Sequence, residues 1–272
     1  MRPFFENNVL QQQPFKPMII VVDTTKAGSA SNTFVLPIIK SNDEVVKIYW
    51  GDGTNSTGVT GNNPHVYAVG GIYTIKIESK IFGGLYFNSS TDVLKIIKII
   101  SYGDGLIRLS DTVFFNCSNL TITGNISSAK ILATSYTYMF GNCVYIASAP
   151  FFNLSRATNV SQMFRNNISL VSVPFYDFSN MTNVSGTFYN CMALQTIPLL
   201  NLSKVKNATD MFFGVTLKTT SYSDFLINLA TLSLQSGVTF SGGNSKYNTA
   251  GATARAYIIS TFGWTITDGG AA

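Results

Sequence analysis

The chain of 272 residues is long enough for one large domain or two modest ones, and only 11 % of its residues are charged, against about 25 % in an average soluble domain. Its 18 basic and 13 acidic residues give a net charge of +5, but the basic residues are scattered and form no patch of the kind that binds nucleic acid. No apolar stretch reaches the roughly 18 residues that span a bilayer, so we expect no membrane insertion.

The first 17 residues form a polar segment bracketed by prolines, in which Phe4, Phe5 and Phe15 are candidate aromatic anchors. Such segments commonly become ordered only when they dock on another subunit. The segment also lacks the apolar stretch and the small-residue cleavage site of a signal peptide. We therefore expect residues 1–17 to be an anchoring arm on a protein that assembles in the host cytoplasm without export.

Residues 18–100 alternate apolar strands with turn residues. A strand at 45–49 leads into a Trp-Gly-Asp-Gly turn at 50–53. A His-Val-Tyr segment at 65–67 and a Gly-Ile-Tyr-Thr-Ile strand at 71–75 follow. This order resembles the polycystic-kidney-disease (PKD) type β-sandwich. The resemblance implies an Ig-like module without catalytic activity that spaces and presents other domains.

Residues 101–216 repeat with a period of 24. Four residue types hold this period, and their members are Phe140, Phe164, Phe188 and Phe212; Pro150, Pro174 and Pro198; Ser155, Ser179 and Ser203; and Asn159, Asn183 and Asn207. Each unit contains a Leu-x-x-Val-Pro type segment, which predicts a short strand ended by the proline, and a Ser-x-x-x-Asn-Val type segment, which predicts a helical turn. One unit cannot bury its Phe, Leu and Val alone. We therefore expect the units to stack into a solenoid with a parallel strand in each coil.

The three cysteines share one position of this repeat. Cys117, Cys143 and Cys191 each end a Phe-x-Asn-Cys segment, which favours small buried fillers stacked along the solenoid. A disulfide or a metal site is the alternative, but the odd count, the wide spacing and the single His disfavour both. The Asn-x-Ser sequons also recur in register. We therefore expect Asn-rich turns to stack their amides into ladders rather than to carry glycans.

The 24-residue units resemble the leucine-rich repeats of BspA-like surface proteins. The segments 179–185 (Ser-Asn-Met-Thr-Asn-Val-Ser) and 188–191 (Phe-Tyr-Asn-Cys) carry this resemblance, which covers about residues 105–215. It implies adhesion or binding at a surface. The pairing of a PKD-like module with such repeats is also similar to the arrangement in bacteriophage virion proteins.

Residues 217–272 are expected to form a C-terminal capping repeat. The segment 250–259 is the one helix that the pattern predicts, and Gly263 supplies its stop. The residues expected on one face of this helix are Ala252, Ala256, Ile259 and Phe262. A closing strand is expected at 264–267. The fold class is thus expected to be mainly β, with a PKD/Ig-like β-sandwich, a BspA-like leucine-rich-repeat solenoid and a capping helix and strand.

No catalytic constellation can be assembled from the sequence. His65 lies inside the PKD-like pattern, where a structural hydrogen bond explains it, and there is no nucleophile elbow, phosphate loop or metal-spaced His pair. Asp43, Glu44 and Asp52 could hold a cation, but residues 51–53 are better explained as a turn and calcium-loop spacing is missing. We expect no enzymatic activity, no cofactor and no metal.

These features predict a non-enzymatic bacteriophage virion protein, either a capsid decoration, a head fibre or a tail-fibre component, that attaches to a host surface protein or glycan. The alternatives are a bacterial BspA-like surface adhesin and a purely structural capsid cement protein. The expected partners are other virion proteins, through the arm, and further copies of the chain. The candidate exposed repeat surface, which mixes aromatic, polar and basic side chains, comprises Tyr145, Arg156, Ser169, Gln195 and Lys204.

Overall fold

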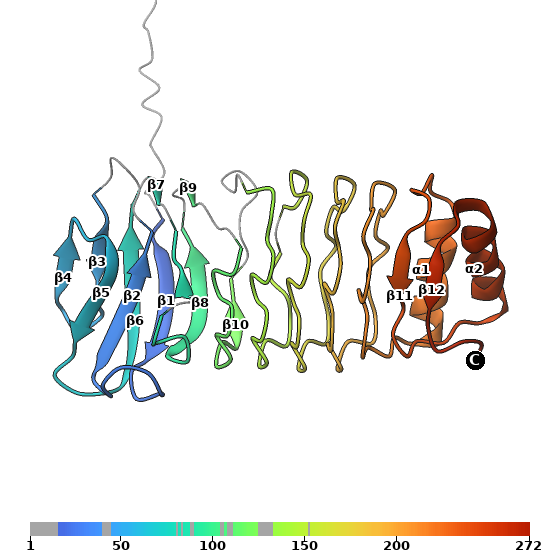
Figure 1. Cartoon of the computed structure of the whole chain (residues 1–272). Helices are drawn as coiled ribbons and strands as arrows, with labels where there is room; N and C mark the ends of the chain where they lie inside the picture. Colours follow the sequence, from blue (N-terminus) through green and yellow to red (C-terminus); the bar gives the residue numbers. More distant parts are fainter. Residues whose placement is uncertain are drawn as a thin grey trace, which may run out of the picture.

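The chain is described here by a computed structural model, which is mainly β and elongated, with sheets at one end, stacked loops in the middle and two helices at the other end (Figure 1). The described residues are 16–39, 45–79, 81–82, 84–87, 90–103, 106–107, 111–124, 133–151 and 153–272. The anchors Phe4, Phe5 and Phe15 of the expected arm lie outside them, as do Asp43 and Glu44.

The N-terminal end contains a six-stranded sheet, a second sheet of two strands and a short parallel pair of strands. The strands, in chain order, are β1 (Met18–Asp23), β2 (Thr33–Ile38), β3 (Lys47–Tyr49), β4 (Asn55–Thr57), β5 (Gly61–Val66), β6 (Ile72–Glu78), β7 (Ile81–Phe82), β8 (Ile96–Tyr102), β9 (Leu106–Ile107) and β10 (Ile122–Thr123). The large sheet has the order β10-β8-β1-β6-β3-β4, β2 pairs with β5 in an antiparallel manner, and β7 pairs with β9 in parallel. Ile20 of β1, Phe34 of β2 and Ile75 of β6 are fully buried, so both sheets contribute to one core.

The Trp-Gly-Asp-Gly and His-Val-Tyr segments meet in an aromatic cluster. His65 stacks on Trp50 with ring centroids 4.5 Å apart, and its Nε2 lies 2.7 Å from Oδ2 of Asp52. The hydroxyl of Tyr67 donates to the carbonyl of Trp50 over 3.0 Å. Burial would raise the pKa of Asp52, but hydrogen bonds from Thr54 and His65 outweigh it and lower this pKa to about 2. His65 therefore has the structural role that the sequence predicts.

A buried ion pair in the turn before β8 binds the loop after β1 through hydrogen bonds. Asp92 and Lys95 are both fully buried, with Nζ 3.7 Å from Oδ1. The Lys95 ammonium donates to the carbonyls of Ser29, Ala30 and Thr33 over 2.7–3.0 Å. The Asp92 carboxylate accepts the Ser29 N–H over 2.7 Å. These bonds offset the cost of removing two charges from water.

The 24-residue step begins within the large sheet. Ile122 of β10 pairs in parallel with Lys98 of β8, and both the N–H and the hydroxyl of Thr121 donate to the carbonyl of Ile97. The partners in each pair are 24 residues apart in sequence, which is one repeat. The stack therefore grows directly from β8, ahead of residue 105, where the repeated residue types first become recognisable.

Successive units are joined by isolated parallel bridges and hydrogen-bonded turns. The bridges are Ser135↔Asn159, Asn159↔Asn183, Asn183↔Asn207 and Ser148↔Ser172. The expectation of a short parallel strand in each coil is thus wrong for these units, because prolines and tight turns leave only single residue pairs in register. The expected helical turn is also absent from the described units: Ala157 N–H donates to Leu154 and closes a single tight turn.

Stacked phenylalanines form a column through the middle of the units. The rings of Phe114, Phe140, Phe164, Phe188 and Phe212 lie 5.4–5.9 Å apart between successive centroids and within 12° of parallel. Phe87 continues this column toward the sheets, and Phe240 continues it toward the C-terminus. One hydrophobic core therefore runs from the sheets to the helices.

The cysteine position is buried, as the sequence predicts. Cys117, Cys143 and Cys191 are free and fully buried, and burial raises the pKa of each thiol. The Cys143 thiol donates to the carbonyl of Phe114 over 3.1 Å. Asn167 occupies the same position in another unit, and its buried amide has no hydrogen-bond partner among the described residues.

An amide ladder is present, but at the Asn two residues after a stacked Phe and not at the sequon Asn residues from which it was predicted. The side-chain N–H of each member donates to the side-chain oxygen of the preceding one over 2.7–3.1 Å, along Asn116, Asn142, Asn166 and Asn190. All four have a positive φ of 57–66°, a conformation that Asn tolerates better than most residues. The sequon residues Asn159 and Asn183 instead accept the N–H of the residue two positions later.

Two helices and two short strands close the C-terminal end. They are α1 (Thr219–Ala230), β11 (Thr239–Ser241), α2 (Thr249–Phe262) and β12 (Thr265–Thr267). Phe240 forms a parallel bridge to Ala208, and β12 then pairs in parallel with β11, so these strands continue the stack. Arg255 holds Asp268 at 2.9 Å and fixes α2 against the final turn.

The expected helix is confirmed as α2, and so are its stop at Gly263 (φ 67°) and the closing strand. Its expected face is wrong: the buried residues are Gly251, Ala254 and Ile258, because α2 packs on α1, where Gly251 lies against Ser223. The expectation of only one helix is also wrong. The buried residues of α1 include Tyr222, Phe225, Leu226 and Leu229, a helical spacing that the sequence already contains.

Candidate binding surface

An exposed apolar row follows the repeated prolines. Phe151, Phe175 and Leu199 occupy the same repeat position, directly after Pro150, Pro174 and Pro198, and are 44 %, 63 % and 50 % exposed. The next residue in two of the units, Tyr176 or Leu200, is buried instead. We call the three exposed side chains the apolar row. They lie one unit apart, along the axis of the stack.

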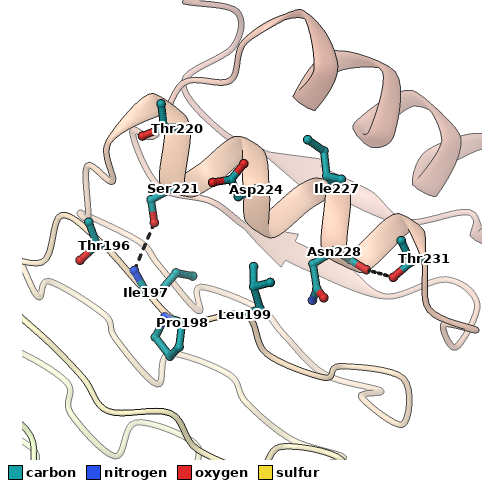
Figure 2. Close-up of a pocket in the computed structure, with 10 residues that line it drawn as sticks. All are labelled: Thr196, Ile197, Pro198, Leu199, Thr220, Ser221, Asp224, Ile227, Asn228 and Thr231. Carbon is teal, nitrogen blue, oxygen red and sulfur yellow. Dashed lines mark hydrogen bonds between the residues drawn. The ribbon is translucent and has the colours of Figure 1, made fainter.

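At its C-terminal end the apolar row enters a groove between the last unit and α1 (Figure 2). The groove has a volume of about 620 Å³. Its lining residues are Thr196, Ile197, Pro198, Leu199, Thr220, Ser221, Asp224, Ile227, Asn228 and Thr231. We call it the α1 groove; Leu199 belongs both to it and to the apolar row.

Two hydrogen bonds hold the walls of the α1 groove together. The Ile197 N–H donates to Oγ of Ser221 over 3.2 Å, and the Asn228 side-chain N–H donates to the carbonyl of Leu200 over 2.9 Å. The two bonds satisfy the Ile197 N–H and the Leu200 carbonyl, because no further unit lies beside these backbone groups to pair with them. They also make the groove a fixed feature, because its two walls cannot separate without breaking them.

Several polar groups of the α1 groove keep unused hydrogen-bonding capacity. Asp224 is exposed, and its carboxylate has no partner among the described residues. The Ser221 hydroxyl accepts from Ile197 and can still donate its own proton. The Asn228 side chain donates one N–H to Leu200, and its side-chain oxygen can still accept a hydrogen bond. The groove therefore combines an apolar wall with several hydrogen-bonding groups.

A second, shallower depression lies on the other side of α1, between α1 and α2. It is lined by Ile227, Ala230, Thr231, Ala250, Thr253, Ala254 and Tyr257. This lining is almost wholly apolar, and Ile227 and Thr231 are shared with the α1 groove. Exposed apolar surface thus continues across the helices to the end of the molecule.

The five residues of the expected repeat surface do not form one site. Tyr145 and Ser169 share one repeat position in neighbouring units, and Gln195 lies two positions further along its unit. Arg156 and Lys204 share another position, two units apart; Asn180 lies between them and accepts from Lys204 over 2.6 Å. Tyr145, Arg156, Gln195 and Lys204 are exposed, and Ser169 is half-buried. None of the five lines the α1 groove.

The apolar row and the α1 groove were missed by reasoning from the sequence. The signal for the row was present, because an apolar residue follows each of the three repeated prolines. The groove needed α1, which was not expected, and it needed the placement of α1 beside residues 196–199. Only the folded chain shows that placement.

The described residues contain no group of three or more His, Cys, Asp or Glu side chains that could hold a metal ion. In the same part of the chain, no helix combines the length and apolar character that crossing a bilayer requires.

The middle of the chain is similar to a known family. The family model described as "Mycoplasma protein of unknown function, DUF285" matches residues 111–225, less than half of the chain. No curated protein and no solved structure matches the chain. The likeness therefore covers the stacked units and the first part of α1, and it carries no assigned function to them.

Proposed function

We propose that the protein is a non-enzymatic attachment protein that displays a binding surface on a stack of repeats. The observation that carries this proposal is the apolar row leading into the α1 groove, which is open and has unused hydrogen-bonding groups. Contiguous exposed apolar surface of this kind typically marks an interaction site. The elongated form of the chain suits this role, because α1, which forms one wall of the groove, lies at the end opposite to the large sheet (Figure 1).

The proposal includes a finer reading of the fold. In this proposal the N-terminal sheets belong to a PKD-like β-sandwich, and the units after them form a BspA-like leucine-rich-repeat solenoid. The Trp50–His65–Tyr67 cluster supports the first assignment, since it uses the residues of the resemblance. The bridges and ladders at 24-residue intervals support the second.

The proposed setting is a bacteriophage virion, as a capsid decoration, head fibre or tail-fibre component. Its support is the resemblance of the PKD-plus-repeat order to virion proteins. Residues 1–17 anchor the chain to other virion proteins, and several copies assemble in each particle. In a bacterial BspA-like adhesin, the other setting, the same surface serves attachment.

A capsid cement protein is the second candidate, and the apolar row is the observation that favours it. Exposed Phe and Leu side chains in a line can also pack on a neighbouring capsid subunit. In that case the row and groove are covered in the particle. The two candidates thus differ in whether this surface is accessible after assembly.

Accessibility and cell binding separate these functions. Antibodies against the stack label intact particles if the protein displays its repeats, and purified full-length chain binds host cells saturably and competes with infection. A chain that is present in particles but not labelled, and that binds no cells, establishes the cement function. If the chain is instead found on the bacterial surface and in no particle, the adhesin is correct.

A further inference from the structure

We propose that the α1 groove, together with the apolar row, binds a neutral oligosaccharide. This inference rests on the proposed attachment function and names the ligand class and the place of binding. It is drawn from the lining of the groove, from the charge within it and from the direction of the row.

The two walls of the groove differ in the way that a saccharide requires. One wall presents the apolar side chains of Ile197, Pro198 and Leu199, and its only polar side chain in the lining is that of Thr196. The other wall is a face of α1, on which Ser221, Asp224 and Asn228 follow each other at helical spacing (Figure 2). A sugar ring has an apolar face of C–H groups and a rim of hydroxyls. The C–H face can pack on Leu199 while the hydroxyls point toward the polar side chains of α1.

The charge within the groove selects among saccharides. Asp224 is the one charged residue of the lining, and no Lys or Arg belongs to it. A carboxylate only accepts hydrogen bonds, and it can take two hydroxyl donors at once through its two oxygens. A sialate, uronate, sulfate or phosphate group would meet the like charge of Asp224 without a compensating cation. A neutral glycan is therefore favoured over an acidic one.

The apolar row extends the site beyond a single sugar. Phe175 lies one unit before Leu199 and exposes 63 % of its surface, so its ring is available to the C–H face of a further sugar. The groove volume of about 620 Å³ lies inside the range of roughly 300–1,000 Å³ that is usual for ligand pockets. An oligosaccharide can thus fill the groove and continue along the row.

The proposal is tested with the full-length protein on an array of defined glycans, followed by calorimetry. The probes are neutral hexose and N-acetylhexosamine oligosaccharides, with sialylated, uronate-containing and sulfated glycans as the acidic set. We expect binding to members of the neutral set. Asp224→Asn should weaken it about tenfold, because a charged acceptor is replaced by a neutral amide. Phe175→Ala should weaken binding of oligosaccharides more than binding of monosaccharides.

Asp210→Asn is the matched control. It makes the same change outside the groove, at a half-buried position with φ 57° that Asn tolerates, and it should leave binding unchanged. Thermal unfolding of all three variants checks that the fold is retained. Three outcomes would each overturn the proposal. They are the absence of binding to any neutral glycan, binding of acidic glycans alone, and equal affinity of wild type and Asp224→Asn for neutral glycans.

Cell binding then separates the groove from the attachment function. If wild type and Asp224→Asn bind host cells equally, attachment stands and the groove is not its site. If wild type binds no cells, the attachment function itself is wrong. If Phe175→Ala changes self-association in ultracentrifugation and leaves glycan binding intact, the row is a contact between copies and its saccharide role is wrong.

Discussion

The N-terminal sheets and the stacked units are stabilised in two different ways. In the sheets, unique polar contacts join residues far apart in sequence, such as Ser29 to Asp92 and Thr24 to Gly71. In the stack, the same few contacts recur every 24 to 26 residues, as in the columns of Phe114 to Phe212 and of Asn116 to Asn190. A destabilising substitution in the sheets should therefore reduce stability across the whole region. One in the stack should mainly reduce the stability of its own unit and the neighbouring units.

The largest expected effect is the removal of Asp92. Asp92→Ala leaves the buried Lys95 ammonium without its counter-ion and Ser29 without an acceptor, so we expect a loss of about 3–5 kcal/mol in the free energy of unfolding. Urea denaturation followed by tryptophan fluorescence measures it. The double variant Asp92→Ala/Lys95→Met should recover part of the loss. A loss below about 1 kcal/mol would mean that the pair is not buried as described.

A slightly smaller loss is expected in the stack from Phe164→Ala. It removes the central ring of the column and leaves a cavity, which costs about 3–4 kcal/mol. Hydrogen exchange should show the main loss of protection in residues 140–212 and little in β1. Equal loss of protection in β1 would contradict the distinction between the two regions and make the whole chain one cooperative unit.

Asn167→Cys should stabilise the protein by about 1–3 kcal/mol, because it replaces a buried amide that lacks partners among the described residues by the residue used in three other units. The reverse change in a neighbouring unit, Cys143→Asn, is its matched control and should destabilise the stack by a similar amount. Thermal unfolding measures both. A water bound to Asn167 would reduce the gain, and a destabilised Asn167→Cys would show that the position is not equivalent between units.

The smallest effect concerns acid stability of the aromatic cluster. The pKa of Asp52 is about 2 in the folded chain and near 3.8 when unperturbed. The ionised carboxylate therefore stabilises the fold above about pH 4, and this contribution disappears as the pH falls through about 2. Asp52→Asn should lower the urea midpoint at pH 5 and lose less stability than wild type between pH 4 and pH 2. Parallel curves for the two proteins would exclude this role of Asp52.

Much of the stack follows from sequence spacing alone. The 24-residue period places Phe140 on Phe164 and Asn142 under Asn166, and a residue in this register has the same neighbours in every unit. The Cys position and the end of α2 at Gly263 follow from the same local rules. The repeat pattern does not determine every position. It predicts a small apolar side chain at residue 167, but the residue there is Asn, and its amide is buried.

The binding surface was decided by tertiary structure. Nothing in the sequence distinguishes Asp224 from the other acidic residues, and Leu199 is an ordinary variable residue of its unit. They line one groove because α1, and not a further coil, lies beside segment 196–200 and hydrogen-bonds to its backbone groups. Likewise, the Asp92–Lys95 pair depends on a loop some 60 residues earlier in the chain. Repetition determines contacts at a fixed distance in sequence, whereas contacts between unlike elements depend on how the whole chain packs.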